Sequence, residues 1–461
     1  MYFYSVLLYY FYIIHIHCYK YVNLYTHFNN YVNGTNNFSL KSQANSELLG
    51  ILNRRSNTFN TKPILTDKLP ISSKLSSGIY TTLPLGHRII NRITNIFKVE
   101  LCKLGAAQLS FPLLNPEKVV SNTGNTVLDN DLFKVSGNGS VEYRLSGTCE
   151  DLCNIVLKNE MIPLSKLQLP VLLYQINTKF RDELRVNEGK VRLKEFLMLD
   201  MYSLHSSEQC SDSTYTLVLE SFANVLRLLG LNFATVNCNK NNIVSDELRV
   251  QHSHNHDQNS NTELEVGHLF KFGTHYSDVY GLKFEISGRK REKLYMNSYG
   301  IGINRLLNVL INNYSDEFGI KLPQLIAPYD VTIIDSTTNG DGWEITRGLM
   351  KKGLTVLYDD RSETIKNKLL DSKRIGVPHI LILGNSLNGK KTFNKKLWEN
   401  INENCKISNY YNLHRGVENV LYKNDNINLN NYSNVMMEYH PRTGDSSSII
   451  NLSNFLKLLN I

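Results

Sequence analysis

The clearest hydrophobic pattern in this chain predicts a helix over residues 85–104. Ile89, Ile93 and Phe97 recur there at intervals of four residues, which places them near one face of a helix. Gly105 follows directly and provides the stop, because glycine accepts the left-handed conformation that commonly ends a helix. Residues 107–112 then predict a strand.

Three more strands are predicted further along. Residues 172–185 and 194–202 flank a polar loop, and two strands joined in this way are typical of an antiparallel sheet. Residues 294–299 form the third strand, which runs into Gly300 and Gly302 and then into a helix that begins near Asn304. We therefore expect residues 70–325 to form a domain built on an antiparallel sheet.

Residues 326–461 show a different order of elements. Strands are predicted at 331–335, 354–359 and 379–384, and helices at 344–352 and 365–373. Alternation of strand and helix is typical of a small α/β domain. The chain is therefore predicted to combine an α+β domain with an α/β domain.

Asn-rich tracts near residues 237–262 and 401–434 interrupt these two domains. Such tracts contain too little apolar surface to fold alone, so we interpret both as surface inserts. The first tract carries His252, His254 and His256, an arrangement that can bind a metal. A polar insert without organised outer hydrogen bonds disfavours a functional metal site, so we predict no fixed metal site in the protein.

Composition narrows the class of protein. Apolar residues make up 42% of the 461 residues and charged residues 20%, with a net charge of +8, which excludes an acidic disordered chain, a multi-span membrane protein and a collagen-like fibre. Seven cysteines show no paired spacing of a disulfide framework or zinc ribbon. These features favour a globular protein of a reducing compartment, with a mild positive charge that permits a polyanionic partner.

Residues 1–46 lie outside the predicted fold. Residues 2–18 are almost wholly apolar and aromatic, and the stretch to Ser46 contains two lysines and no acidic residue. This pattern predicts a secretory signal followed by a transit-like extension, and a plastid as the destination rather than a mitochondrion. Two alternatives remain: a single membrane anchor, although 17 residues fall short of the roughly 20 that span a bilayer, and a wrongly assigned start.

Two segments carry candidate chemistry. Arg181 stands at the end of a predicted strand, and Arg192 follows across the hairpin, so their guanidinium groups can hold a polyphosphate from two sides. Phe196 on the returning strand offers a ring on which a purine can stack. The alternative is a hairpin with a solvated charged loop.

The second segment is Gly300-Ile301-Gly302, with Arg305 in the first turn of the next helix. Glycines let a backbone approach a ligand closely, and an arginine at a helix N-terminus is placed to bind a phosphate. In isolation the two glycines favour a tight turn. The specific signal is that these glycines follow, in chain order, the helix–strand segment that ends at Pro112 and then the Arg181 segment.

These three segments resemble motifs 1, 2 and 3 of the class II aminoacyl-tRNA synthetases. The matching stretches are Gly78-Ile79-Tyr80 with Gly86 and Phe111-Pro112 for motif 1, and residues 178–183 with 195–205 for motif 2. Motif 2 and residues 265–277, which lead into motif 3, together resemble the bacterial-type prolyl-tRNA synthetases. Residues 359–361, 375–379 and 438–444 resemble the anticodon-binding domain of the prolyl, threonyl, histidyl and glycyl enzymes.

The resemblance implies a proline–tRNA ligase that activates L-proline with ATP and Mg²⁺ and transfers it to tRNA(Pro). It implies that Arg181 contacts the α-phosphate and the substrate carboxylate, and that Arg192 and Arg305 hold the terminal phosphates, with Arg181 and Arg305 as the catalytic residues. The nucleotide would also be bound by Phe196, Glu183 and, through Mg²⁺, Glu265.

The resemblance also assigns the proline pocket and the partners. Thr148 and Glu150 match a Thr-x-Glu loop that binds the imino nitrogen, and the residues that line or border the pocket are Met198, His205, His268 and Ser298. Asp360, Arg361 and Lys366 would contact the anticodon. A homodimer formed through motif 1 is implied, as is a mature protein without stable membrane association.

The sequence departs from the family pattern near the pocket. Cys149 and Asp151 replace the usual residues of the Thr-x-Glu loop, Asn297 replaces a glycine, and Lys271 replaces a glutamine. We expect the last two to alter the shape of the proline pocket. They are also the best support for the alternative that the chain is a non-catalytic paralogue that binds nucleic acid. A threonyl or histidyl ligase is a further alternative, which residues 265–277 disfavour.

The interval between motifs 2 and 3 is short. Bacterial-type relatives commonly carry an inserted domain there that hydrolyses mischarged alanyl-tRNA. Only 36 residues separate Gly230 from Gly267, whereas a compact domain needs at least about 50. We therefore predict that the editing domain is missing.

Overall fold

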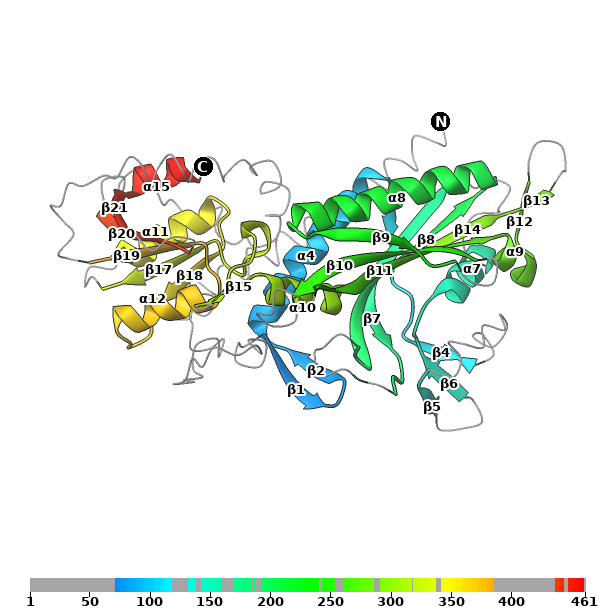
Figure 1. Cartoon of the computed structure of the whole chain (residues 1–461), viewed down its shortest axis with the longest axis horizontal. Helices are drawn as coiled ribbons and strands as arrows, with labels where there is room; N and C mark the ends of the chain where they lie inside the picture. The colour runs from blue at the N-terminus through cyan, green and yellow to red at the C-terminus, as the bar shows by residue number, and fades with distance from the viewer. Residues whose placement is uncertain are drawn as a thin grey trace, which may run out of the picture.

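The computed structural model describes residues 71–117, 132–137, 142–159, 169–184, 186, 192–239, 243–253, 261–285, 291–316, 318–336, 341–384, 436–442 and 447–459. They form an antiparallel-sheet domain followed by an α/β domain (Figure 1), which confirms the predicted fold class. The predicted targeting segment 1–46, residues 401–434, and His254 and His256 lie outside the described residues. No described helix combines the length and the hydropathy needed to cross a membrane.

The first domain is built on a seven-stranded sheet within the described residues. Its strands lie in the order β3 (Ala107–Gln108), β7 (Val171–Phe180), β8 (Glu195–His205), β14 (Tyr295–Gly302), β11 (Asn261–Gly273), β10 (Val244–Ser253) and β9 (Phe233–Asn237). All neighbours pair antiparallel except β3 and β7.

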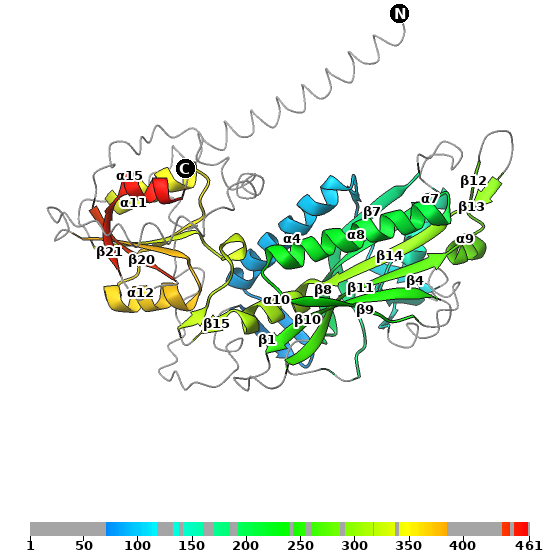
Figure 2. The ribbon, with the colours of Figure 1, turned by 45° about the horizontal axis from the view of Figure 1, so that its top comes forward.

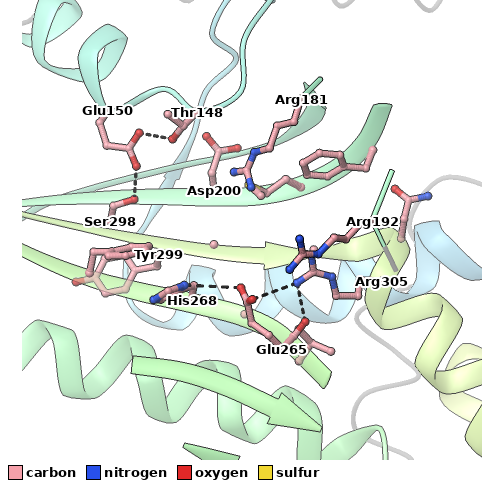
Figure 3. Close-up of a pocket in the computed structure, with 18 of the residues that line it drawn as sticks. Thr148, Glu150, Arg181, Arg192, Asp200, Glu265, His268, Ser298, Tyr299 and Arg305 are labelled. Atoms are coloured by element: carbon pink, nitrogen blue, oxygen red, sulfur yellow. Dashed lines mark hydrogen bonds and ion pairs between the residues drawn. The ribbon is translucent and has the colours of Figure 1, made fainter. Parts of the chain in front are cut away.

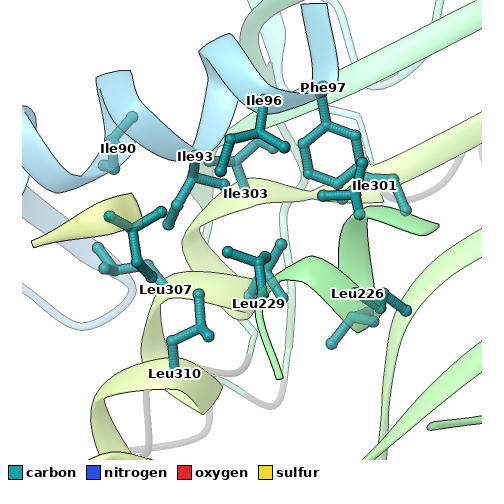
Figure 4. Close-up of a cluster of buried hydrophobic side chains, with 14 of the residues drawn as sticks. Ile90, Ile93, Ile96, Phe97, Leu226, Leu229, Ile301, Ile303, Leu307 and Leu310 are labelled. Carbon is teal, nitrogen blue, oxygen red and sulfur yellow. The ribbon is translucent and has the colours of Figure 1, made fainter. Parts of the chain in front are cut away.

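Three helices cover one face of this sheet: α4 (Pro84–Lys103), α8 (Glu208–Leu228) and α10 (Ile303–Asn313). Figures 1 and 2 show α4 and α8 side by side across the strands. Ile93 and Phe97 of α4 meet Leu226 of α8, Ile301 of β14 and Leu307 of α10 in one apolar cluster (Figure 4). The predicted periodicity of residues 85–104 therefore marks the face of α4 that packs on the sheet, and Gly105 ends this helix with a φ of 72°.

The strand predicted over residues 107–112 is shorter than expected. Only Ala107 and Gln108 pair with β7, because Pro112 has no N–H to donate to a ladder and the N–H of Phe111 donates to Gln175 Oε1 instead, at 3.0 Å.

Smaller elements complete the domain. They are the pair β1 (Ser72–Ser76) and β2 (Ile79–Thr82), the sheet of β4 (Leu114–Pro116), β6 (Glu142–Leu145) and β5 (Lys134–Ser136), the pair β12 (Lys283–Glu285) and β13 (Arg291–Lys293), the pair β15 (Ser315–Asp316) and β16 (Gly319–Ile320), and the helices α7 (Glu150–Asn159), α9 (His275–Tyr280) and η4 (Gln324–Ile326).

About half of the polar tract near 237–262 belongs to strands of the main sheet and is not an insert. Residues 244–253 form β10, whose Leu248 and Val250 are fully buried against the helices while the intervening residues are polar. A strand with one buried face needs an apolar residue at every second position only, so its composition resembles that of a loop. The interval between Gly230 and Gly267 is thus occupied by three strands of the main sheet, β9, β10 and part of β11.

The second domain has a five-stranded sheet in its described part, in the order β18 (Val356–Asp359), β17 (Val331–Asp335), β19 (His379–Leu383), β20 (Met436–Pro441) and β21 (Ser448–Asn451). Helices α11 (Asp341–Lys351) and α15 (Leu452–Leu458) pack on one face, and α12 (Ile365–Arg374) lies on the other. The predicted strand–helix alternation is confirmed, with ends displaced by three residues at most.

Buried ion pairs join the two domains. Arg92 on α4 donates to Asp330 Oδ1 at 3.0 Å, and Arg442 makes a bidentate pair with Asp316 at 2.7 Å on both nitrogens. Asp330 and Arg442 are both buried, so these contacts hold the α/β domain against the end of the first domain next to α4 and α10.

Candidate active site

A cavity of about 370 Å³ opens on the sheet face opposite the helices. Its floor is formed by the alternate residues of β8, β11 and β14 that point away from the helix-covered core. Eleven of the twelve residues predicted for ATP and proline line it, and they are Thr148, Glu150, Arg181, Glu183, Arg192, Phe196, Met198, Glu265, His268, Ser298 and Arg305. Residues from five separate segments therefore converge on one cavity, as Figure 3 shows.

Glu150 is the buried carboxylate at one end of the cavity. It stands at the start of α7, with 8% of its surface exposed, and it accepts hydrogen bonds from Ser298 Oγ at 2.8 Å and from Thr148 Oγ1. Both partners of this side chain in the described residues are neutral hydroxyls. Because a buried carboxylate is stable only when its charge is compensated, this end of the cavity is suited to a cationic group.

A buried polar network that the sequence reasoning missed lies beside Glu150. Asp200 lines the cavity and accepts from Gln175 Nε2 at 2.9 Å and Tyr202 Oη at 2.7 Å, while Lys179 Nζ lies 3.2 Å from the same oxygen, Oδ2. Burial opposes the charge on Lys179, but Asp200 and Cys149 together outweigh it and raise the pKa of the ammonium group. A sequence signal exists, since Gln175, Asn177 and Lys179 are polar residues at alternate positions of β7 and so share one face of that strand.

The other end of the cavity is rich in guanidinium groups. Arg181 follows the last residue of β7, Arg305 lies in the first turn of α10, and Arg192 is 59% exposed across the opening. Arg305 donates to the Glu265 carbonyl at 2.7 Å, and its Nη1 lies 3.6 Å from the Glu265 carboxylate. Burial depresses the pKa of Arg305 from its very high ordinary value.

A β-bulge places Glu265 and His268 on the same side. The register between β10 and β11 shifts between the Leu248–Gly267 and Arg249–Glu265 pairs, which leaves Val266 as the extra residue. His268 Nδ1 consequently lies 3.7 Å from Glu265. Burial raises the pKa of the Glu265 carboxyl, but His268 and Arg305 outweigh it and lower the pKa overall.

Two polar atoms at this end of the cavity are buried without a hydrogen-bond partner in the described residues: Arg181 Nε and His268 Nε2. The Arg181 guanidinium lies over the Phe196 ring, 5.5 Å from its centroid, and its Nη2 donates only a long bond of 3.4 Å to the Gly147 carbonyl. Arg181 therefore has donors left for an anionic ligand.

The two glycines before Arg305 are part of a strand. β14 runs through Gly302, so the tight turn that two isolated glycines favour is not formed. Gly300 and Gly302 both line the cavity. A Cβ added at Gly300 or Gly302 would come no closer than 3.5 Å to the surrounding atoms, so a side chain there would fit and would take up space in the cavity.

His205 does not reach the cavity, and its assignment to the proline pocket is wrong. The side chain is fully buried on the helix side of β8, where Nε2 lies 2.8 Å from Ser203 Oγ and Nδ1 3.4 Å from Cys210 Sγ. Burial lowers the pKa of His205 to about 4, so it is neutral at physiological pH.

Lys271 and Asn297 do not shape the cavity either. They pair with each other across β11 and β14, and both point to the helix side. Lys271 binds Asp212 of α8 at 2.7 Å, and Asn297 donates to the Ser211 carbonyl at 3.1 Å and accepts from Ser211 Oγ. The two departures thus form contacts with α8, which removes the main support for a non-catalytic paralogue.

Arg361 is not placed to contact an anticodon base. It is buried, and its guanidinium donates to Asp359 at 2.8 and 2.9 Å and to Asp371 at 2.9 Å. The hydrogen bonds of its guanidinium group hold β18 and α12 together, so the assignment of Arg361 to the anticodon is wrong. Asp360 and Lys366 are exposed next to it.

Comparisons with known proteins agree with this geometry. Residues 133–314 match the family of the tRNA synthetase class II core domain (G, H, P, S and T), and residues 330–396 match an anticodon binding domain. The chain is 27% identical over 368 residues to the proline–tRNA ligase of Neorickettsia sennetsu, a match that covers 67% of this chain and 83% of that protein. It is 29% identical over 355 residues to the probable mitochondrial proline–tRNA ligase of Homo sapiens, covering 67% and 74%.

The fold resembles that of Giardia lamblia prolyl-tRNA synthetase, solved in complex with prolyl-adenylate. The TM-score is 0.64 at 18% identity, over 86% of this chain and 74% of that one. The predicted pair of domains, a class II core and an anticodon-binding domain, is therefore confirmed.

Proposed function

We propose that this chain, which has the core domain of a class II tRNA synthetase followed by an anticodon-binding domain, is a proline–tRNA ligase. The relatives that match it over two thirds of its length are named for this activity. The observation that carries the proposal is the cavity itself. One end has the buried Glu150 carboxylate, which has no basic partner in the described part of the chain, and the other end has three guanidinium groups. This charge pattern complements an amino acid joined to a nucleotide phosphate.

The first step joins proline to ATP. An oxygen of the proline carboxylate forms a bond to the α-phosphorus, and the bond from that phosphorus to the bridging oxygen breaks, so that pyrophosphate leaves with the electron pair. Negative charge is spread over the phosphoryl oxygens in the transition state, and cationic donors held in place lower its energy. Arg181 contacts the α-phosphate and the carboxylate, and Arg192 and Arg305 hold the terminal phosphates.

The remaining groups position the two substrates. Thr148 and Glu150 bind the imino nitrogen, Met198, His268 and Ser298 line the proline pocket, and Phe196 and Glu183 seat the nucleotide. In the second step, the terminal ribose hydroxyl of the tRNA attacks the prolyl carbonyl carbon, and AMP leaves.

The residues present fit a magnesium ion that arrives with ATP. Glu247, Glu265 and His268 each offer a ligand atom within 4.8 Å of the others. Carboxylate oxygens are ligands that Mg²⁺ accepts, with water and phosphate oxygens completing the shell, so Glu247 and Glu265 would hold it. The ion would neutralise phosphate charge.

The α/β domain, residues 326–461, would bind the anticodon stem of tRNA(Pro). Asp360 and Lys366 are exposed at the end of β18 and in the first turn of α12, where a nucleic acid can reach them. We further propose a homodimer and a mature protein without a stable membrane association.

The enzyme would act in organellar translation. The mitochondrial name of the human relative supports an organelle, and the apolar, acid-free segment 1–46 supports delivery to a plastid through the secretory route. A reporter fused to residues 1–46 should be found in an organelle. A diffuse cytosolic signal would contradict this part of the proposal.

Amino-acid-dependent exchange of pyrophosphate into ATP tests the function. The purified protein should incorporate labelled pyrophosphate with L-proline and not with threonine or histidine, because only proline matches the assigned pocket. Exchange that depends on threonine or histidine would identify another ligase. Binding of tRNA without any exchange would identify a non-catalytic paralogue.

A further inference from the structure

We propose that Asp200 is a second carboxylate that binds the secondary ammonium group of the substrate, opposite Glu150. This inference rests on the proposed function, because it assigns a role to a residue in the amino acid end of the same cavity. It makes Asp200 a residue that determines specificity for a cyclic secondary amine.

The two Asp200 oxygens are used unevenly. Oδ2 receives Gln175 Nε2 at 2.9 Å and Tyr202 Oη at 2.7 Å, with Lys179 Nζ at 3.2 Å. Oδ1 is buried and has no hydrogen-bond partner in the described residues. A buried carboxylate oxygen without a donor is costly, and Asp200 is 3% exposed and lines the cavity. A ligand that donates to Oδ1 would remove this cost.

This acceptor lies close to a donor that is also available. Figure 3 shows Asp200 between Thr148 and Arg181, whose Nε has no hydrogen-bond partner among the residues that the structure describes. An amino acid zwitterion carries an anion and a cation two bonds apart. Its carboxylate would accept from Arg181, and its ammonium would donate to Asp200.

The number of N–H donors on the substrate matches the number of carboxylates in the cavity. A secondary ammonium has two N–H bonds, and the cavity offers two carboxylates, Glu150 and Asp200. Lys179 compensates one of the two negative charges from below, since its ammonium is fully buried between Asp200 and Cys149 Sγ, 3.1 Å away. One negative charge is left over for the substrate cation.

The network around Asp200 makes Asp200→Asn a directed test. Three donors point at the Oδ2 position, so the amide oxygen of the asparagine will take that place and its NH₂ group will face the cavity. The variant therefore puts a donor where the ammonium needs an acceptor. Losing one hydrogen bond to a charged group corresponds to a weakening between about 10-fold and 150-fold.

The experiment measures the dissociation constants of two ligands by calorimetry. L-proline should bind Asp200→Asn at least about 10-fold more weakly than it binds the parent. Tetrahydrofuran-2-carboxylate, which keeps the ring and the carboxylate but has no N–H, should bind both proteins within about twofold. The Michaelis constant for ATP should stay within about threefold. The matched control is Asp212→Asn, which also neutralises a lysine-paired aspartate, on α8 outside the cavity, and should leave proline binding unchanged.

Two results would overturn the inference. Equal weakening of both ligands would mean that Asp200 only maintains the packing, and unchanged proline binding would mean that water occupies the Oδ1 site. If Asp200→Asn does not fold because Lys179 loses its counter-charge, the double variant Lys179→Met/Asp200→Asn removes both charges and must give the same selective loss. Failure of the parent protein to catalyse proline-dependent exchange would refute the proposed function itself.

Discussion

Replacing Arg181 with alanine should separate catalysis from stability. Among the described residues this side chain makes a long hydrogen bond, 3.4 Å to the Gly147 carbonyl, and a contact with the Phe196 ring at 5.5 Å. Its Nε has no hydrogen-bond partner within the same part of the chain. The change therefore removes little more than a cation–π contact, and we expect the free energy of unfolding to fall by about 1 kcal/mol or less.

The expected effect on the reaction is far larger. Arg181 would supply two charge-assisted hydrogen bonds to the reacting phosphoryl and carboxylate groups, each contributing roughly 1.5–3 kcal/mol. Their loss raises the barrier by about 3 kcal/mol or more, which corresponds to a rate reduced at least about 150-fold. Arg181→Lys keeps a charge but loses the planar fork, so it should recover only part of this rate.

The assay is proline-dependent ATP–pyrophosphate exchange, with urea unfolding measured on the same preparations. Arg181→Ala should unfold near the parental midpoint while its exchange rate drops by two orders of magnitude. Exchange within threefold of the parent would refute the role assigned to Arg181. A large loss of stability would show instead that the side chain is structural.

Four further predictions follow from the site and the fold. Glu150→Gln should raise the Michaelis constant for proline far more than that for ATP, whereas Arg305→Ala should do the reverse; equal changes in either variant would refute the division of the cavity. Arg361→Ala should lower the free energy of unfolding in urea by about 3 kcal/mol, because it removes the bidentate partner of the buried Asp359 carboxylate and a partner of Asp371; unchanged stability with weaker tRNA binding would restore its anticodon role. Burial lowers the pKa of His205 and that of His379 to about 4. Between pH 6.5 and 4 the unfolded chain therefore binds more protons than the folded protein. The free energy of unfolding should fall by about 2 kcal/mol per histidine from pH 7 to 5. A His205→Gln variant should remove about half of that fall in urea titrations, and an unchanged pH dependence would contradict it. Finally, the enzyme should form alanyl-tRNA measurably, since a smaller side chain is excluded from the pocket by only ~1–3 kcal/mol. It should not hydrolyse preformed alanyl-tRNA, because the editing domain is predicted to be missing; deacylation above the spontaneous rate would contradict this prediction.

Hydrophobic patterns within single segments predict much of the fold. The periodicity of residues 85–104 predicts α4 because its apolar residues meet one contiguous core, and the alternation after residue 330 predicts β17, β18 and β19 with helices α11 and α12, but not β20, β21 or α15. β10 was missed because only one of its faces is buried, so its sequence is as polar as that of a loop. Composition alone does not separate the two cases.

The site residues likewise divide into those that a single sequence segment reveals and those whose role depends on strand pairing. Arg181, Arg305 and Glu150 stand beside glycines or at the ends of elements, where their chemistry is visible in the sequence. Asp200 was missed because its role depends on the register that sets it opposite Gln175 and above Lys179, which no single segment reveals. His205 was assigned wrongly because a strand of eleven residues alternates its faces, and its odd-numbered positions point at the helices.

Side-chain partners explain the remaining error. Arg361 lies in a stretch that resembles an RNA-binding domain, and an arginine there suggests a base contact. The structure instead pairs it with Asp359, two residues earlier at the end of β18, and with Asp371, ten residues later in α12. The motif alone does not show that the guanidinium turns inward to these two carboxylates.

The most direct test of the central claim is a charging reaction with a complete tRNA pool. The purified protein would be given ATP, Mg²⁺, labelled L-proline and unfractionated organellar tRNA, and the acylated molecules would be recovered by their resistance to periodate oxidation and sequenced. A proline–tRNA ligase predicts that label enters the pool and that the protected molecules are tRNA(Pro). No protected tRNA, or protection of another tRNA with another amino acid, would contradict it.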